Sequence, residues 1–463
     1  MKRTKIVCTI GPASAQPATL KAMMKSGLNV ARLNFSHGTH QSHEELIKLI
    51  RTTSQKLGLP VAILGDLQGP KIRLGDLPEA GVKLKNGEVV QFSTAVSNYQ
   101  SGGALPLTYK GLHQDLKKGH RFLIDDGLLE LVVIGIKGRV ISAKVINGGV
   151  VTSHKGMNFP DSTLSVSPIT AKDKKDVEFA VKQGVDWLAL SFVTSAKNIL
   201  DLRRLIKKAA KKNQVLPRII VKIEKHEAID HFDEILAVVD GVMVARGDLG
   251  IEIPAEEVPI RQKEIIEKCR LAGKPVVVAT QMMDSMIRNP RPTRAEVSDV
   301  ANAVFDHTDA VMLSGESATG KYPVKAVKLM AKIVTEAEAS PYDDVAVFRG
   351  RTQGSGPSLA SILKILAADR QIDGVIAMPQ ALPWSEHLLM FHPEIPLFLV
   401  TKQVTVQRQN YLRWGVWPVL VKSKISPRIL INQLKKQKLV KRKMRLAVVE
   451  NETKKTDFDI ISL

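Results

Sequence analysis

Eight short apolar runs alternate with stretches of helical period along this chain, and each run ends in polar or charged residues. Two of them lie between Ile219 and Pro254, where the sequence reads IIVKIEKHEAI and then GVMVARGDLGIEIP. Continuous apolar runs of this length are typical of buried parallel strands. Repeated strand–helix units predict a (β/α)8 TIM barrel, whose active sites lie at the carboxyl ends of the strands.

The first three predicted strands lie in KIVCTIGPAS, LNVARLNFSHG and VAILGDLQGPKIR, and the later five are predicted at 187–192, 218–223, 241–245, 275–279 and 310–313. Polar residues follow these runs at regular positions, as expected for one shared site: Arg32, Asn34, Asp66, Ser191, Lys222, Glu224, Asp248, Thr280, Ser314 and Glu316. Scattered surface residues would not produce this regularity.

The helical period disappears between residues 70 and 165 and is replaced by short Val- and Ile-rich runs separated by turn residues. Asn86-Gly87 and Asp126-Gly127 are the dipeptides that most favour β-hairpins. We therefore predict a small β-barrel lid domain at 70–165, inserted after the third strand of a catalytic barrel at 1–69 and 166–344.

A second strand–helix series begins after the linker GRTQGSGPS, with strands predicted at 374–378, 396–400, 418–421 and 445–449. Its first helix, LASILKILAAD, is apolar enough to be core. This pattern predicts a C-terminal three-layer α/β domain at 345–463.

Composition limits the class of protein further. A chain of 463 residues is expected to form two or three domains. It has no run of about 18 apolar residues and no signal-peptide pattern at its start, so we expect a cytoplasmic protein without a membrane partner. The two cysteines, Cys8 and Cys269, exclude a disulfide framework and a cysteine metal cluster.

The net charge of +21 is concentrated late in the chain, where residues 402–445 contain thirteen Lys or Arg and no Asp or Glu. A basic face of this kind attracts anions. Because the stretch lacks any nucleic-acid motif, we do not expect nucleic-acid binding, and an anionic effector on the C-terminal domain is the alternative to a merely solvated surface.

The stretch between Ile219 and Pro254 also predicts chemistry. A lysine at the end of a strand, such as Lys222, can face a developing anion. Glu224 and Asp248 follow consecutive strands, so their carboxylates can share a hard divalent metal through oxygen ligands. A metal-dependent reaction of an anionic substrate is therefore predicted.

Eight segments together closely resemble the pyruvate kinase family, in its bacterial type without an N-terminal extension. They are TKIVCTIGPAS, NVARLNFSHG, DLQGPKIR, VKIEKHEAI, MVARGDLGIEIP, ATQMMDSM, NPRPTRAEVSDVANAV and MLSGESATGKYP, in the family's order. The resemblance implies transfer of the phosphoryl group of phosphoenolpyruvate to ADP, giving pyruvate and ATP, the last step of glycolysis. It also implies Mg²⁺ or Mn²⁺, K⁺, and an allosteric homotetramer.

The resemblance further implies roles for individual residues. Lys222 would stabilise the moving phosphoryl group and the enolate, and Arg32 would hold the phosphoryl group. Glu224 and Asp248 would bind the divalent metal. The backbone N–H groups of Gly247 and Asp248, with Thr280, would hold the substrate carboxylate, and Thr280 would help deliver the proton.

On the nucleotide side, the resemblance implies phosphate contacts from Arg73 and Lys155 on the lid. Asn34 and His37 lie in the segment that the family uses for the nucleotide.

The third-strand segment departs from the pattern of many family members, because it reads DLQGPK, so that Lys71 stands where they carry glutamate. We expect the Lys71 ammonium to replace potassium near Asn34, Ser36 and Asp66, which would make catalysis independent of potassium.

The C-terminal domain departs more. Members activated by a sugar bisphosphate have a hydroxyl-rich phosphate loop after its first strand, whereas this chain has MPQALPW. Proline lacks the N–H group that a phosphate cradle uses. We therefore expect no activation by fructose 1,6-bisphosphate through this loop.

Two alternative functions remain open from the sequence. Another barrel enzyme with a metal-bound enolate would explain Glu224 and Asp248, but not the lid or Arg73. A catalytically reduced copy that binds through its basic C-terminal domain is disfavoured by Lys222, Glu224, Asp248 and Thr280.

Overall fold

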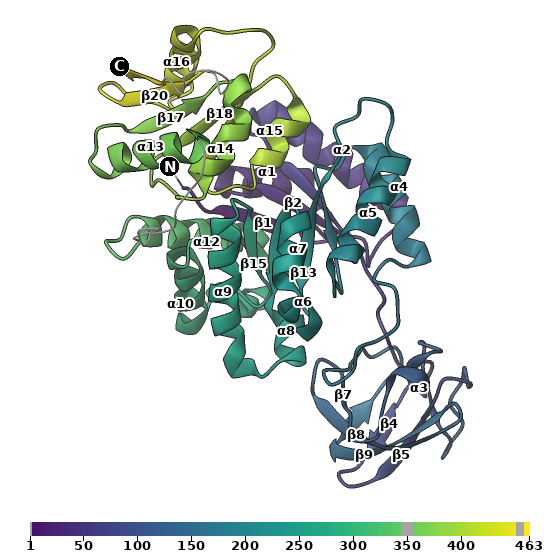
Figure 1. Ribbon diagram of the computed structural model, residues 1–463. Coiled ribbons are helices and arrows are strands. Elements are labelled where there is room, and N and C mark those ends of the chain that lie inside the picture. The colour runs from purple at the N-terminus through teal and green to yellow at the C-terminus, as the bar shows by residue number, and fades with distance from the viewer. Residues whose placement is uncertain (1, 344–354, 451–457) are drawn as a thin grey trace.

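The computed structural model describes residues 2–343, 355–450 and 458–463. Eight parallel strands close into a barrel in the order β1-β16-β15-β14-β13-β12-β3-β2 (Figure 1). They are β1 (Lys5–Thr9), β2 (Val30–Asn34), β3 (Ala62–Asp66), β12 (Trp187–Leu190), β13 (Arg218–Ile223), β14 (Gly241–Ala245), β15 (Val276–Ala279) and β16 (Ala310–Leu313). The predicted TIM barrel is confirmed.

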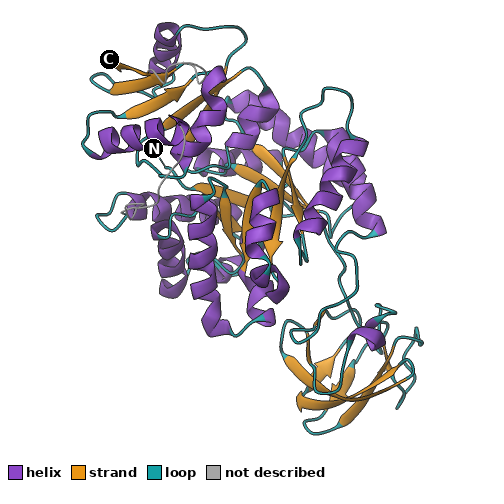
Figure 2. Cartoon of the chain, viewed as in Figure 1, coloured by secondary structure: helices purple, strands orange, loops and turns teal. Residues whose placement is uncertain are grey.

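Helices surround this barrel (Figure 2). They are α1 (Pro17–Ser26), α2 (His40–Leu57), α4 (Ala171–Gln183), α5 (Ala196–Ala209), α6 (His226–Asp230), α7 (Phe232–Val238), α8 (Arg246–Glu252), α9 (Val258–Leu271), α10 (Arg294–Phe305), α11 (Gly315–Ala318) and α12 (Pro323–Glu338), with short 3₁₀ turns η1 (Ala255–Glu257) and η2 (Asp284–Ile287). The local sequence determines where three of these helices begin: Thr39, Thr170 and Thr293 cap α2, α4 and α10 through capping boxes. Among the described residues, no helix combines the length and apolarity needed to span a bilayer.

The chain leaves the barrel after β3 and returns at α4, and we call the part between, residues 70–165, the lid. Figure 1 shows it hanging from one end of the barrel on two chain segments. Its elements are β4 (Val82–Leu84), β5 (Val89–Ser93), β6 (Leu105–Pro106), α3 (Leu112–Asp115), β7 (Arg121–Ile124), β8 (Leu129–Lys137), β9 (Val140–Asn147), β10 (Gly149–Val151) and β11 (Met157–Asn158). Six strands form one sheet, in the order β11-β7-β8-β9-β5-β6, and β10 pairs with β4 in a second. Its buried apolar side chains form a hydrophobic core of their own, separate from that of the barrel.

One of the two hairpin predictions in the lid is wrong. Asp126-Gly127 does lie in the turn of the β7–β8 hairpin, where Ile124 pairs with Leu129. Asn86-Gly87 forms a turn, but β4 before it pairs with β10 and β5 after it pairs with β9. The Asn86 side chain instead accepts a hydrogen bond from the Gly148 amide at 2.7 Å, so long-range pairing decides the partners of these strands.

The C-terminal domain is a five-stranded sheet, in the order β19-β18-β17-β20-β21, with helices on both faces. Its elements are α13 (Ser355–Ala368), β17 (Gly374–Ala377), η3 (Pro379–Ala381), α14 (Leu382–Leu389), β18 (Leu397–Thr401), α15 (Val404–Asn410), β19 (Val416–Leu420), α16 (Pro427–Lys436), β20 (Arg445–Val449) and β21 (Phe458–Ser462). The sequence analysis missed β21, an antiparallel edge strand paired with β20. The predicted boundary at 345 and the first part of the linker, 350–354, lie outside the described residues.

This domain packs against the amino-terminal end of the barrel. The Lys5 ammonium, at the start of β1, donates to the Val416 carbonyl at 2.7 Å, and the Trp187 indole donates to the Gln409 carbonyl at 3.2 Å. Leu412 lies among the side chains that fill the barrel interior. One end of the barrel is therefore closed by protein, and the carboxyl ends of the strands face the lid.

Candidate active site

The carboxyl ends of the barrel strands enclose a cavity of about 120 Å³. Nearly all of the residues that the sequence analysis assigned to the barrel part of the site line it: Arg32, Asn34, Ser36, Asp66, Lys71, Lys222, Glu224, Asp248 and Thr280. They come from five different strands or the loops after them, which the closed barrel alone brings together.

Lys222 lies near the end of β13, with its ammonium held between a hydroxyl and a carboxylate. Its Nζ donates to Ser191 Oγ at 3.0 Å and lies 3.0 Å from Glu224 Oε2. Burial opposes its charge, but the carboxylates of Asp66 and Glu224 outweigh this and raise the pKa of Lys222. The carboxylates therefore favour the charged form of the lysine that faces the cavity.

Glu224 and Asp248 supply the carboxylates of the cavity. Glu224 is 1% exposed, and its Oε1 accepts the Phe192 amide at 2.6 Å. Burial, with Asp248 nearby, raises the pKa of Glu224 to about 7. A buried carboxylate of raised pKa next to a second carboxylate fits a divalent cation, because the cation's charge would favour the ionised form of both.

Arg32, at the end of β2, is fixed from two sides. Its guanidinium contacts Asp66 Oδ2 at 2.6 and 2.7 Å and donates to Thr9 Oγ1 at 2.8 Å. Burial opposes ionisation of Asp66, but Lys222 and Arg32 outweigh it and lower the pKa of Asp66. The guanidinium is thus held at the cavity by a carboxylate that stays ionised.

Thr280 follows β15 in a strained conformation, with φ +69°, and the next residue, Gln281, has φ +54°. The Thr280 hydroxyl donates to the Ala279 carbonyl at 2.6 Å and accepts the Gly247 amide at 2.7 Å. The Gly247 N–H is therefore engaged by Thr280, which differs from our expectation of a free group. Two successive left-handed residues that are not glycine persist only where the surroundings fix them.

Arg246 is the residue that fixes this turn, and the sequence analysis did not assign it to the site. Its Nη2 donates to the Thr280 carbonyl at 2.9 Å, and its Nη1 lies 2.6 Å from Asp299 Oδ1 on α10. The sequence did indicate Arg246, because it directly follows the apolar run of β14 and precedes Gly247. Its partner could not be found from the sequence, since Asp299 lies 53 residues further on.

Lys71 extends from the start of the lid and lines the same cavity. Burial of its ammonium, together with Lys222 and Arg73, lowers its pKa. Its positive charge in turn helps to lower the pKa of Asp66. Asn34, whose side chain accepts the Ser36 amide at 3.1 Å, also lines this cavity.

A second cleft, of about 340 Å³, lies between the lid and the barrel and is lined by both. Arg73 and Lys155 contribute from the lid, and Asp248 contributes from the barrel. The Arg73 guanidinium donates to the His154 carbonyl at 2.7 Å, and the Lys155 ammonium pairs with Asp125 at 2.8 Å. The two lid cations therefore face the side of the barrel that carries Asp248.

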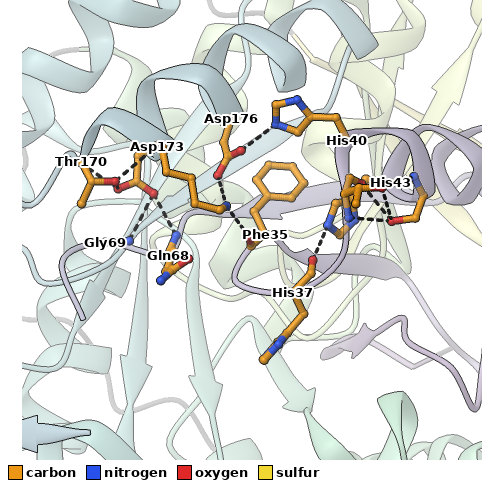
Figure 3. A network of polar contacts seen from close by, with 12 residues as sticks. Phe35, His37, His40, His43, Gln68, Gly69, Thr170, Asp173 and Asp176 are labelled. Atoms are coloured by element: carbon orange, nitrogen blue, oxygen red, sulfur yellow. Dashed lines mark hydrogen bonds and ion pairs between the residues drawn. The ribbon is translucent and has the colours of Figure 1, made fainter. Parts of the chain in front are cut away.

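His37 is not brought into the site. Its side chain is exposed and points away from the surrounding polar network (Figure 3), and it is absent from the described residues that line the two cavities. Its backbone is engaged instead: the carbonyl contacts the ring of His43 at 2.8 Å, and the amide donates to the Asn34 carbonyl at 3.2 Å.

A further cluster beside the cleft consists of His226, Glu227 and Glu252, whose ligand-type atoms lie within 4.8 Å of one another. The Lys225 ammonium already pairs with Glu252 at 2.9 Å, and Asn158 of the lid donates to the same carboxylate at 3.5 Å. The cluster is an ion-pair network at the junction with the lid.

The fold and this cavity define a barrel enzyme with a cationic pocket that also holds the carboxylates of Glu224 and Asp248. Residues 1–327 match the family model described as pyruvate kinase, barrel domain. The chain is 45% identical over 431 residues to pyruvate kinase 2 of Synechocystis sp., covering 91% of this chain and 71% of the relative. It is 42% identical over 425 residues to pyruvate kinase of Clostridium acetobutylicum, covering 91% and 89%. The chain belongs to the pyruvate kinase family.

Proposed function

We propose that this protein transfers the phosphoryl group of phosphoenolpyruvate to ADP and so forms pyruvate and ATP. The observation that carries the proposal is the convergence of Arg32, Lys222, Glu224 and Thr280 on one cavity beneath a lid that carries two further cations. Phosphoryl transfer requires mainly positioning and the neutralisation of spread-out negative charge, which such a cavity supplies.

In this reaction Arg32 holds the phosphoryl group, with its fork oriented by Asp66 and Thr9. Lys222 faces the phosphoryl group as it moves and the enolate left behind. Its raised pKa keeps it charged, so the lysine acts as an electrostatic stabiliser rather than as a base. Thr280, held by Arg246 and Gly247, binds the substrate carboxylate and helps deliver a proton to the enolate carbon.

Glu224 and Asp248 are the residues that would hold Mg²⁺ or Mn²⁺. The donor set supports this assignment, since hard divalent cations prefer carboxylate oxygens. When bound, such an ion neutralises the negative charge of phosphate and enolate oxygens. Arg73 and Lys155 would contact the phosphates of the nucleotide from the lid.

We further propose that Lys71 supplies the positive charge that a potassium ion provides in other members of the family. Support comes from its place in the same cavity as Asn34, Ser36 and Asp66. An ammonium fixed to the chain at this point makes a second cation there electrostatically costly.

As the family resemblance implies, we propose a cytoplasmic homotetramer that responds to an anionic effector on its C-terminal domain. The loop after β17 continues into η3 and α14. We expect fructose 1,6-bisphosphate to leave the phosphoenolpyruvate saturation curve unchanged, and a leftward shift of that curve would contradict this expectation.

The direct test of the proposed function is an assay of pyruvate formation coupled to lactate dehydrogenase, with phosphoenolpyruvate, ADP and Mg²⁺. We expect pyruvate and ATP in equal amounts and no reaction after chelation of the metal. Absence of pyruvate with every divalent metal supplied would overturn the proposal.

A further inference from the structure

Two chain segments connect the lid to the barrel, and both pass the start of helix α4. The outgoing segment follows β3 and includes Gln68 and Gly69, and the returning segment ends at Thr170, the N-cap of α4. Between them lies Asp173, which is fully buried at 0% exposure.

The Asp173 carboxylate binds both segments at once (Figure 3). Its Oδ1 accepts the amides of Gln68 and Gly69 at 3.1 and 3.2 Å. Its Oδ2 accepts the amide and the hydroxyl of Thr170 at 2.9 and 2.6 Å. Capping the helix requires only the contacts to Thr170, so the contacts of Oδ1 serve another purpose.

The outgoing segment also contacts the catalytic cavity directly. Gly69 has φ +67°, and a Cβ at this position would lie 2.6 Å from the ring of Phe192, whose amide binds Glu224. One residue before Gln68, the Leu67 carbonyl accepts the Ser191 hydroxyl at 2.8 Å, and this hydroxyl accepts from Lys222. The place where Asp173 holds the chain is therefore one contact away from the residues that bind metal and substrate.

We propose that Asp173 is a positioning residue that fixes the hinge of the lid. By joining the outgoing and returning segments at one point, it makes the lid move as a rigid body about that point, so that Arg73 and Lys155 meet the nucleotide in one geometry. Without it, the two segments move independently, and the lid cations lose part of their preorganisation. The proposal rests on the proposed function for the roles of Arg73 and Lys155.

Asp176 provides a matched control one turn along the same helix. It is also buried, at 2% exposure, and it pairs with His40 at 2.7 Å and with Lys172 at 2.6 Å. Lys172 in turn donates to the Phe35 carbonyl at 2.6 Å. Asp176 thus holds the loop after β2, whereas Asp173 holds the segments of the lid.

The first test measures amide hydrogen exchange in the whole protein without substrates. In Asp173→Asn and Asp173→Ala we expect the amides of Gln68 and Gly69 to exchange about tenfold faster or more, since they lose a charged acceptor. In Asp176→Asn we expect these amides to exchange at the parent rate. Unchanged exchange in both Asp173 variants, or equal acceleration in Asp176→Asn, would overturn the proposal.

The second test separates positioning from folding through kinetics. We expect Asp173→Asn to raise the KM for ADP about five- to tenfold, while the KM for phosphoenolpyruvate changes less than twofold, because Arg73 and Lys155 meet the nucleotide and the residues proposed to hold phosphoenolpyruvate lie on the barrel. Equal changes in both KM values would show a merely structural role and overturn the proposal.

Thr170→Val serves as a further variant if the Asp173 variants fail to fold. It keeps the contacts of Asp173 to the outgoing segment and removes the hydroxyl contact to the returning segment. We expect it to raise the KM for ADP at least twofold while the exchange of Gln68 and Gly69 stays at the parent rate; an unchanged KM would count against the hinge. If no variant and not even the parent forms pyruvate, the proposed function fails, whereas the exchange measurement still decides the role of Asp173.

Discussion

Two lysines lie at opposite ends of the same barrel, and their surroundings shift the pKa of the ammonium group in opposite directions. Lys222, at the carboxyl end, is surrounded by carboxylates that raise its pKa. Lys5, at the amino-terminal end, is 1% exposed and lies 5.3 and 5.0 Å from the rings of Tyr411 and Trp417. Burial lowers the pKa of Lys5 to about 7, and Lys2 adds to this effect.

The difference shows what each end of the barrel is built for. A buried charge requires charges of opposite sign around it. The carboxyl end of the barrel keeps several such charged groups although burying them lowers the stability of the fold, as is common for functional sites. The amino-terminal end is covered by another domain and offers Lys5 a carbonyl and aromatic rings. The predictions below test this contrast, from the largest expected effect to the smallest.

Replacing each lysine by methionine separates the two ends most clearly. We expect Lys222→Met to lower kcat about 10³-fold, because it removes a preorganised charge from the site of phosphoryl transfer. Lys5→Met should keep kcat within about twofold, since it lies at the end that chemistry does not use. The coupled assay on folded variants measures both, and equal losses of kcat would refute the contrast.

The carboxylates around Lys222 are expected to bind metal, and those near Lys225 are not. Glu224→Gln should weaken Mn²⁺ binding about tenfold or more, because the amide lacks the charge of a metal ligand. Glu252→Gln, in the neighbouring ion-pair cluster, should leave the affinity unchanged. Electron paramagnetic resonance of free Mn²⁺ measures this without any turnover, and weaker binding in the Glu252 variant alone would reverse the assignment.

A third cation, Lys71, should decide whether the carboxyl end needs potassium. We expect the parent protein to react equally fast in tetramethylammonium buffer with and without KCl. Lys71→Glu should become dependent on KCl by about tenfold, because the lost ammonium leaves a place for a monovalent cation. A rise above about tenfold on adding potassium to the parent would show that Lys71 does not replace it.

At the other end, Lys5 should make stability depend on pH. The unfolded chain holds this proton up to about pH 10.5, whereas the folded protein releases it near pH 7. Between these values the unfolded state binds more protons, so raising the pH favours folding by up to about 1.4 kcal/mol per unit. Lys5→Met should therefore flatten the rise of the thermal midpoint between pH 7 and pH 9.5.

In Lys5→Met, Lys2 still contributes part of the rise of the thermal midpoint with pH, since burial lowers the pKa of Lys2 to about 8. The exposed Lys21 is the control, and Lys21→Met should leave the slope unchanged. An undiminished slope in Lys5→Met would mean that Lys5 is charged in the folded protein.

Much of the barrel could be predicted because each strand is marked by a short apolar run of neighbouring residues. Each apolar run was visible in the sequence, and four of the five strand ends that were predicted to a single residue coincide with the observed ends, as at Ala279 and Leu313. The exception is β12, which ends at Leu190 rather than Phe192, because Phe192 has φ +55° and leaves the strand to place its amide on Glu224.

Pairing over long distances could not be predicted. Asn86-Gly87 was read as a hairpin because the dipeptide favours a tight turn, but the turn does not choose which strands pair. The edge strand β21, which pairs only with β20, was missed. In the site, Arg246 was visible at a strand end, but Asp299 and the Thr280 carbonyl that it binds were not.

By itself, the sequence determined the order of strands and helices and which residue types follow each strand, because period and turn chemistry are properties of neighbouring residues. It also carried the family segments around Lys222. Only the tertiary structure decided the state of these residues. Whether a lysine is surrounded by carboxylates, as at Lys222, or by rings and a carbonyl, as at Lys5, depends on side chains far away in the chain that the closed barrel brings together.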